Sequence, residues 1–167
     1  MKLPFTLAVA AALSSTVALV APAKAQRGDA MTFVAKAGAS DLYEIQSSQI
    51  AMRRARDPRV RAMAGMLVRD HRRTTMQVTA AARAAGMRPR PPMLEPRQRM
   101  MISQLNRAPA RSFDQVYLSQ QIPAHQEALD MIRGYAARGG VPSLRRAATG
   151  AIPIVEHHLA EARRLQH

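Results

Sequence analysis

The 167-residue sequence contains no cysteine and few acidic residues, and each shortage excludes a class of site. Without cysteine the chain cannot form disulfide bonds, a thiolate nucleophile or a sulfur-rich metal site. Only 11 acidic residues face 25 lysines and arginines, so the formal net charge is +14. The sequence also lacks a nucleophile elbow, a glycine-rich phosphate loop and a paired-acid arrangement. These absences argue against an enzyme.

The first 25 residues are typical of a secretory signal peptide. Lys2 supplies a basic start, an uncharged run extends over residues 3–21, and Ala23 and Ala25 are small residues at the positions that signal peptidase recognises. We therefore predict cleavage before Gln26 and export to the periplasm. The remaining residues, 26–167, are expected to form a single domain.

Beyond the signal peptide the hydrophobic pattern predicts helices and no strand. We expect four long helices over residues 31–55, 58–85, 113–138 and 142–166, with a short helix near residues 95–106. The first and last connections are short, and the middle one is long and rich in proline. This pattern is typical of two helical hairpins joined by a crossover. The expected fold class is all-α, a ferritin-like four-helix bundle with the crossover between the second and third helices.

The ends of these helices are marked by local signals. Asp57 fits an N-cap before Pro58, and Ser112 fits an N-cap before Phe113. Gly86 fits a C-cap, because glycine adopts the left-handed conformation that ends many helices.

Three histidines lie within the apolar stripes of three different predicted helices. His71 lies in the stripe over residues 60–85, His125 in that over 118–136, and His158 in that over 144–165. Counting about 1.5 Å per residue from the connecting turns places all three at one height, level with Glu44 of the first helix. Burying an imidazole without a partner costs about 1 to 3 kcal/mol. Such a layer therefore needs mutual hydrogen bonds, water or a metal ion.

The inward face of the first helix is less sharply defined than that of the other three. In the fourth helix, His157 is expected to lie outside the layer. Glu44 sits at the edge of the best apolar face, beside Ala37, Ser48 and Ala51. That apolar face consists of Val34, Gly38, Leu42, Ile45, Gln49 and Met52.

We predict an exported metal-binding or envelope stress module in which Glu44, His71, His125 and His158 bind one divalent ion. Three imidazoles and a carboxylate suit zinc, copper, manganese or iron. A di-iron centre is not expected, because ferritin-like di-iron sites use two Glu-x-x-His motifs and the sequence has none. The competing interpretation is a structural layer in which hydrogen bonds hold the histidines. The residues proposed to supply such bonds around the layer are Asp70, Asp114 and Gln121.

At these positions the chain resembles the family catalogued as domain of unknown function 4142, exported bacterial proteins grouped with ferritin-like bundles. The resemblance spans nearly all of the chain after the signal peptide. It implies the fold and the exported location but no established activity, and it places Glu44, Asp70, His71, His125 and His158 at motif positions. The residues that carry it are Phe33-Val34, Glu44 to Ala51, Met66 to His71, Phe113-Asp114 with Tyr117, His125, Pro153 and His158-Leu159.

Two other interpretations remain open. After signal removal the net charge falls from +14 to +12, and every basic residue except Lys36 is arginine. Such a surface is suited to docking on anionic membrane or envelope components. Nucleic acid is not expected as a partner, because no basic motif with interleaved aromatics is present. Alternatively, methionines such as Met63, Met66 and the Met100-Met101 pair offer soft ligands for copper(I). Oligomeric state does not follow from the sequence.

Overall fold

The computed structural model describes residues 23–167, and these residues form helices without any strand. The expected all-helical class is confirmed. Residues 1–22 of the predicted signal peptide lie outside the described part of the chain. Among the helices described, none has a stretch long and apolar enough to cross a membrane. The elements are α1 (Ala23–Arg54), α2 (Pro58–Ala84), α3 (Pro96–Arg107), the 3₁₀ turn η1 (Ala110–Ser112), α4 (Phe113–Arg138) and α5 (Pro142–Gln166).

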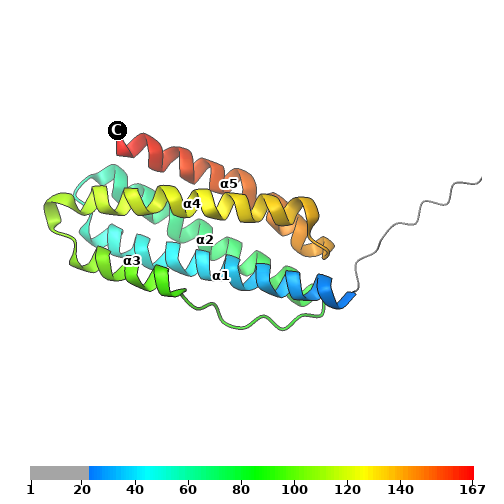
Figure 1. Ribbon diagram of the computed structural model, residues 1–167. Coiled ribbons are helices and arrows are strands. Elements are labelled where there is room, and N and C mark those ends of the chain that lie inside the picture. Colours follow the sequence, from blue (N-terminus) through cyan, green and yellow to red (C-terminus); the bar gives the residue numbers. More distant parts are fainter. Residues whose placement is uncertain (1–22) are drawn as a thin grey trace, which may run out of the picture.

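The four long helices lie side by side, as Figure 1 shows. Short connections join α1 to α2 and α4 to α5, so each pair forms a helical hairpin. The hairpins pack together through α2 against α5 and α1 against α4. The short helix α3 follows the crossover and packs against α1 and α4. The crossover passes close to α1, since a Cβ atom added at Gly38 would lie 3.1 Å from Cβ of Pro92.

Most helix ends follow the local signals in the sequence. Oδ1 of Asp57 accepts a hydrogen bond from the Arg59 amide at 2.7 Å, which is the expected N-cap of α2. Gly86 has a φ of 69°, and the Gly86 and Met87 amides donate to carbonyls in the last turn of α2. Ser112 occupies the N-cap position of α4 but forms no capping bond, because its hydroxyl donates to the Pro109 carbonyl within η1.

Helix α1 begins at Ala23, eight residues before the predicted start at residue 31. Residues 23–30 are rich in alanine, which has the highest helix propensity. Ala30 is fully buried in the core cluster, so the last residue of this added segment also contributes to packing.

The predicted apolar face of α1 is wrong. Met52, assigned to it, is 47% exposed, and Leu42 and Ile45 are only half-buried. The face that packs inward is rotated and carries several polar side chains in its middle. Hydrophobic periodicity therefore gave the wrong orientation where the buried face itself is polar. The buried residues in the middle of α1 are Asp41, Tyr43, Glu44, Ser47 and Ser48.

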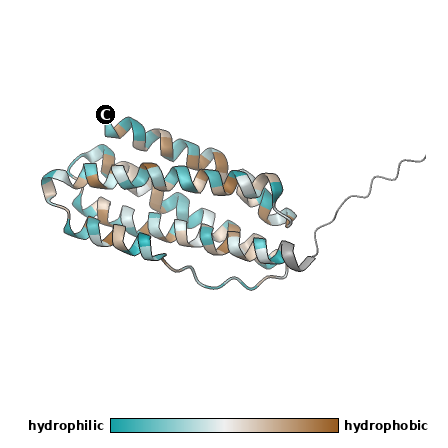
Figure 2. Ribbon diagram, viewed as in Figure 1, coloured by the Kyte–Doolittle hydropathy of each residue, from teal (hydrophilic) through white to brown (hydrophobic). Residues whose placement is uncertain are grey.

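The hydrophobic core is divided into two clusters by a layer of buried polar side chains. One cluster is built around Phe33, Leu129 and Leu144, and the other around Leu67 and Phe113. Hydrophobic and hydrophilic residues alternate along each long helix in Figure 2, as expected for helices with one buried face. The polar layer between the clusters contains Asp41, Glu44, Ser47, Ser48, His71, Thr74, Gln121, His125 and His158.

Candidate metal centre

The three predicted histidines converge in this polar layer. His71 comes from α2, His125 from α4 and His158 from α5, and each is at most 3% exposed. The ring centroids lie 5.6 Å apart for His71 and His125, 5.2 Å for His71 and His158, and 5.5 Å for His125 and His158. The height estimated by counting residues therefore agrees with the structure.

One nitrogen of each ring is held by an oxygen atom at the periphery of the layer. Nδ1 of His71 lies 2.8 Å from Oδ1 of Asp41, and Nδ1 of His125 lies 2.9 Å from the Gln121 carbonyl. Nε2 of His158 lies 3.1 Å from Oδ2 of Asp70. A carbonyl or an ionised carboxylate can only accept, so each of these three nitrogens carries the proton and donates.

The other nitrogen of each ring therefore presents a lone pair when the imidazole is neutral. These atoms are Nε2 of His71, Nε2 of His125 and Nδ1 of His158. All three are buried, and within residues 23–167 none has a hydrogen-bond partner. Three lone pairs cannot hydrogen-bond to one another, because each is an acceptor. The centre of the layer therefore suits a cation.

The ring nitrogens lie almost as close together as the ligand atoms around a bound metal ion. One nitrogen from each histidine lies within 4.8 Å of the other two. Metal–nitrogen bonds of about 2.0 to 2.1 Å in a tetrahedral site separate the nitrogens by about 3.4 Å. Movements of about 1 Å or less per ring would bring the three nitrogens to that separation. The outer hydrogen bonds match those that commonly orient metal-binding histidines.

The electrostatics of the layer separate His71 from the other two histidines. Burial, with the charge of His71 as a second cause, lowers the pKa of His125 to about 3 and that of His158 to about 4. Burial also acts to lower the pKa of His71, but the hydrogen bond and charge of Asp41 outweigh it and raise this pKa above its usual value. Two imidazoles are thus neutral at pH 7, the form that binds metals, and His71 holds a proton more tightly.

Glu44 is buried beside His125 but does not belong to the converging group of nitrogens. Its Oε1 lies 3.8 Å from Nδ1 of His125, the nitrogen already bonded to Gln121. Neither carboxylate oxygen of Glu44 has a hydrogen-bond partner among the described residues. Burial raises the pKa of Glu44 to about 7. Glu44 is therefore an uncommitted carboxyl group at the margin of the layer.

The other predicted residues lie in different places. Asp70 contacts His158, and Gln121 contacts His125 through its backbone carbonyl while its side-chain amide donates to Ser47. Asp114 is not part of the layer: it accepts hydrogen bonds from the Arg56 and Asp57 amides at the α1–α2 turn.

Position along α4 explains why Asp114 is absent from the layer. Asp114 precedes His125 by eleven residues, or about 16 Å along a helix, which is too far for contact. His157 is exposed, as expected from its position on the outward face of the predicted helix.

Sequence reasoning missed Asp41, which forms the shortest of the three outer contacts. Asp41 also accepts hydrogen bonds from Thr74 at 2.9 Å and from Thr75 at 2.7 Å. A signal was present, because Asp41 and Glu44 are three residues apart and so share a helix face. The wrong orientation predicted for α1 hid it.

Comparison with known proteins gives a family and a similar solved structure. The profile of the family described as "Domain of unknown function (DUF4142)" matches residues 15–165. No curated protein is significantly similar in sequence. The solved structure "CopM in the Cu(I)-bound form" has a TM-score of 0.69 and 18% sequence identity, covering 81% of this chain and 93% of that chain. At this identity the likeness shows a shared helical fold.

Proposed function

The chain belongs to the DUF4142 family, and from that premise we propose that it is an exported metal-binding protein whose His71, His125 and His158 hold one transition-metal ion. The observation that supports this proposal most strongly is the arrangement of the nitrogens. Every outer nitrogen donates to a fixed oxygen acceptor, and every inner nitrogen is buried without a hydrogen-bond partner in the described chain.

The energetic argument favours an ion over a purely structural layer. Each buried polar atom left unpaired costs about 1 to 3 kcal/mol, and three occur at one point. Hydrogen bonds among the neutral rings cannot remove this cost. Each neutral imidazole has one N–H group, and that group already donates to an outer oxygen. A proton on His71 relieves it in part, whereas a metal ion satisfies all three nitrogens at once. In this proposal a proton on His71, whose pKa Asp41 raises, competes with the metal ion for the inner nitrogen of that ring.

The surrounding carboxylates suit a cation of one or two charges. Asp41 and Asp70 contact the outer nitrogens of two ligands, and Glu44 is buried next to the third. We propose that Glu44 balances the charge of the ion and can become a fourth ligand if its side chain rotates. Imidazole binds copper, zinc and iron well. Copper is the first ion to test, because the structurally similar CopM was solved in a Cu(I)-bound form.

Copper(I) binding through methionines alone has less support. Met63 is 3% exposed and packs in the apolar cluster around Leu67, so its thioether is surrounded by hydrocarbon. Met52 on α1, Met76 on α2 and Met93 in the crossover are exposed in three different parts of the chain.

Location and architecture are also part of the proposal. Residues 1–25 carry the features of a signal peptide, and we infer a periplasmic location from them. We interpret the two packed hairpins as one ferritin-like four-helix bundle in which α3 belongs to the crossover.

The test is a titration of the purified protein, residues 26–167, with Cu(I), Cu(II), Zn²⁺, Mn²⁺ and Fe²⁺ after treatment with a chelator. The proposal expects one saturable site per chain for at least one ion, and the same ion in protein isolated from the periplasm. If none of these ions saturates a site, the layer is a hydrogen-bonded feature of the core and the proposal is wrong.

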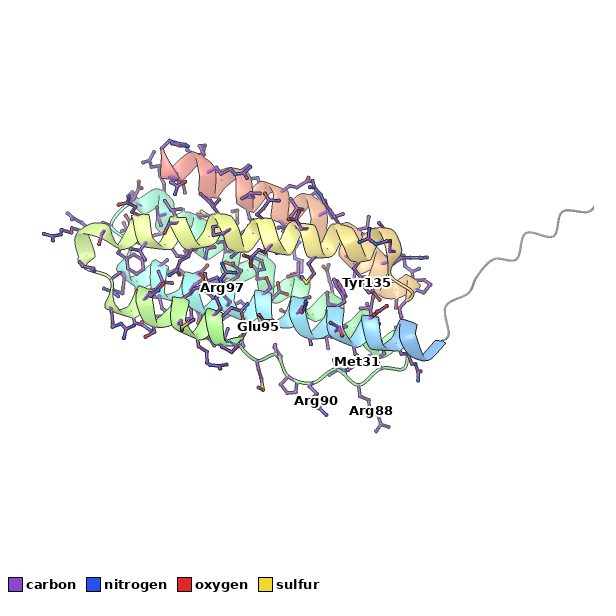
Figure 3. All side chains as sticks on the ribbon, viewed as in Figure 1. Met31, Arg88, Arg90, Glu95, Arg97 and Tyr135 are labelled. Carbon is purple, nitrogen blue, oxygen red and sulfur yellow. The ribbon has the colours of Figure 1, made fainter. Side chains whose placement is uncertain are left out.

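A second candidate function, docking on anionic phospholipid, is favoured by the charge on α2 and the crossover. Residues 58–94 contain eight arginines and one acidic residue, Asp70, which is engaged with His158. Arg88 and Arg90 project away from the helices in Figure 3. Each exposed guanidinium group can donate two parallel hydrogen bonds to two oxygens of one phosphate. Six exposed arginines of this surface form no ion pair or side-chain hydrogen bond within residues 23–167, namely Arg69, Arg72, Arg73, Arg83, Arg88 and Arg90.

A further inference from the structure

A cavity of about 240 Å³ lies between α1, α3 and α4. Ser40 and Tyr43 line it from α1, and Ala124 and Ala128 line it from α4. Three of these four side chains are small, so they fill the space between the two helices poorly. Packing between α1 and α4 is also the sparsest among the four neighbouring pairs of long helices. Fewer residues therefore pack directly against each other along this seam than between the other neighbouring pairs of long helices.

The cavity lies next to the histidine layer. Tyr43 directly precedes Glu44, and Ala124 directly precedes His125. Ser40 is four residues from Glu44, slightly more than one helical turn or about 6 Å along the helix. Oε1 of Glu44 and Nδ1 of His125 are 3.8 Å apart. The α1 wall and the α4 wall of the cavity are therefore each followed in sequence by one of two neighbouring residues of the layer. A short opening of the seam would connect the cavity to the imidazoles.

The cavity walls also carry atoms that bind metals. Met101 from α3 and Met131 from α4 supply thioethers, and Glu95 and Glu127 supply carboxylates. Thioethers are soft ligands that suit copper(I), and carboxylates suit harder ions. Glu127 is paired with Arg97 at 2.7 Å, and both side chains are more than half exposed. Arg97 comes from α3 and Glu127 from α4, so this exposed ion pair joins the two helices beside the cavity, and Figure 3 shows Arg97 in this region.

A second groove is less suited to passage of an ion. It lies between the crossover and the α1–α2 pair and has a volume of about 370 Å³. Asp41 and Thr75 line it on the side of His71. There Asp41 accepts hydrogen bonds from His71, Thr74 and Thr75, and an ion would have to break them to pass. Opening the α1–α4 seam would separate Tyr43 from Gln120 and break two further hydrogen bonds between α1 and α4, but none of these bonds holds a histidine.

We propose that the cavity between α1, α3 and α4 is the route by which the metal ion reaches the buried imidazoles. This inference rests on the proposed function. Met101, Met131 and Glu127 bind the incoming ion weakly and take the place of part of its water shell. The ion then passes between Ser40 and the alanines of α4 to the three histidines. Release follows the same path in reverse.

The experiment measures the rates of metal loading and release by stopped flow, using Cu(I) presented with a chromophoric chelator, or Zn²⁺ with an indicator dye if only zinc binds. Ala128→Leu fills the proposed route. Ala35→Leu makes the same change in the second groove and serves as the matched control. Met101→Leu removes a thioether from the cavity with little change in volume.

We expect Ala128→Leu to slow loading and release by roughly tenfold each and to leave the dissociation constant almost unchanged. Met101→Leu should slow loading, and Ala35→Leu should leave both rates as in the wild type. Wild-type loading rates in both Ala128→Leu and Met101→Leu would overturn the proposed route, as would equal slowing by Ala35→Leu. If Ala128→Leu does not fold, Met101→Leu decides. Metal binding with unchanged kinetics thus rejects the route alone, whereas the absence of any binding rejects the proposed function.

Discussion

Asp41 on α1 holds His71 on α2 through a hydrogen bond of 2.8 Å between Oδ1 and Nδ1. This bond fixes which nitrogen of His71 carries the proton and turns the other nitrogen toward His125 and His158. Because Thr74 and Thr75 also donate to Asp41, the carboxylate is held in one position. The bond therefore orients a ligand of the proposed metal site from outside that site.

Asp41→Asn should weaken metal binding by about 10- to 100-fold, the usual effect of removing a carboxylate behind a metal-binding histidine. The asparagine can still accept a hydrogen bond but has no charge to support a cation. Competition titration against a chelator measures the change. Asp130→Asn is the control, since Asp130 is exposed on α4, and it should bind as the wild type does. Equal affinity in the two variants would show that Asp41 does not orient a ligand.

Substitution of the three core histidines should separate binding from structural roles. His71→Ala, His125→Ala and His158→Ala should each abolish stoichiometric binding, and His157→Ala should leave it nearly intact. A bound ion stabilises the native state by about 2.7 to 4.1 kcal/mol at 100 to 1,000 times Kd, so the wild type should gain this amount and the core variants little. Thermal unfolding with and without metal tests the expectation. Equal losses in His157→Ala and His158→Ala would contradict it.

The metal-free protein should be most stable near pH 6.5. His125 and His158 have native pKa values of about 3 and 4, below the unfolded value of about 6.5, so the unfolded state binds more protons between these limits and stability rises with pH. Glu44, raised to about 7, opposes this between about pH 4.5 and 7. Between about pH 4.5 and 6.5 the unfolded state therefore binds about one proton more than the native state. The free energy of unfolding then rises by about 1.4 kcal/mol per pH unit. Above pH 6.5 only Glu44 and His71 act, and stability falls.

Urea denaturation with a chelator across pH 4 to 8 measures this profile. Glu44→Gln should steepen the rise between pH 4.5 and 6.5 and reduce the decline above it, because one opposing group is removed. A wild-type stability that continues to rise between pH 6.5 and 7.5 would show that the layer titrates differently. Added metal should move the maximum to higher pH, since metal binding requires neutral imidazoles.

Arg54→Met should destabilise the fold by about 2 kcal/mol, because hydrogen bonds from a charged group contribute about 1.5 to 3 kcal/mol. The Arg54 guanidinium donates to the carbonyls of Leu105, Asn106 and Ala108 and lies 4.9 Å from the Phe113 ring centroid. It thereby attaches the end of α1 to the last turn of α3. Arg53→Met, one residue away and exposed, should change stability by less than about 0.5 kcal/mol. Chemical denaturation of both variants decides.

The arginine-rich surface should bind vesicles of anionic phospholipid at low salt and release them near 0.5 M salt, where the Debye length is only about 4 Å. Sedimentation with vesicles containing phosphatidylglycerol measures this, with phosphatidylcholine vesicles as the neutral comparison. Arg72→Gln with Arg73→Gln should weaken binding more than Arg107→Gln with Arg111→Gln, although both pairs lose the same charge. Equal effects would indicate attraction to net charge without a defined surface, and inhibition by soluble polyphosphate alone would indicate a different anion.

Local sequence determined the positions of most helices. Asp57-Pro58 starts α2 and Gly86 ends it, because capping and chain reversal depend on residues close together in the chain. The inward positions of His71, His125 and His158 also followed from the sequence, since most residues around them in each stripe are apolar and fix which side of the helix is buried.

The tertiary structure alone decided how α1 faces the other helices and which acids support the histidines. The buried face of α1 carries Asp41, Glu44, Ser47 and Ser48, so its hydrophobic pattern pointed elsewhere. Those polar side chains are buried because partners on α2 and α4 satisfy several of them, and such partners come from distant parts of the sequence. Composition showed that carboxylates were scarce. Only the packing of α1 against α2 brought Asp41 to His71, because that contact depends on the rotation of one helix against another.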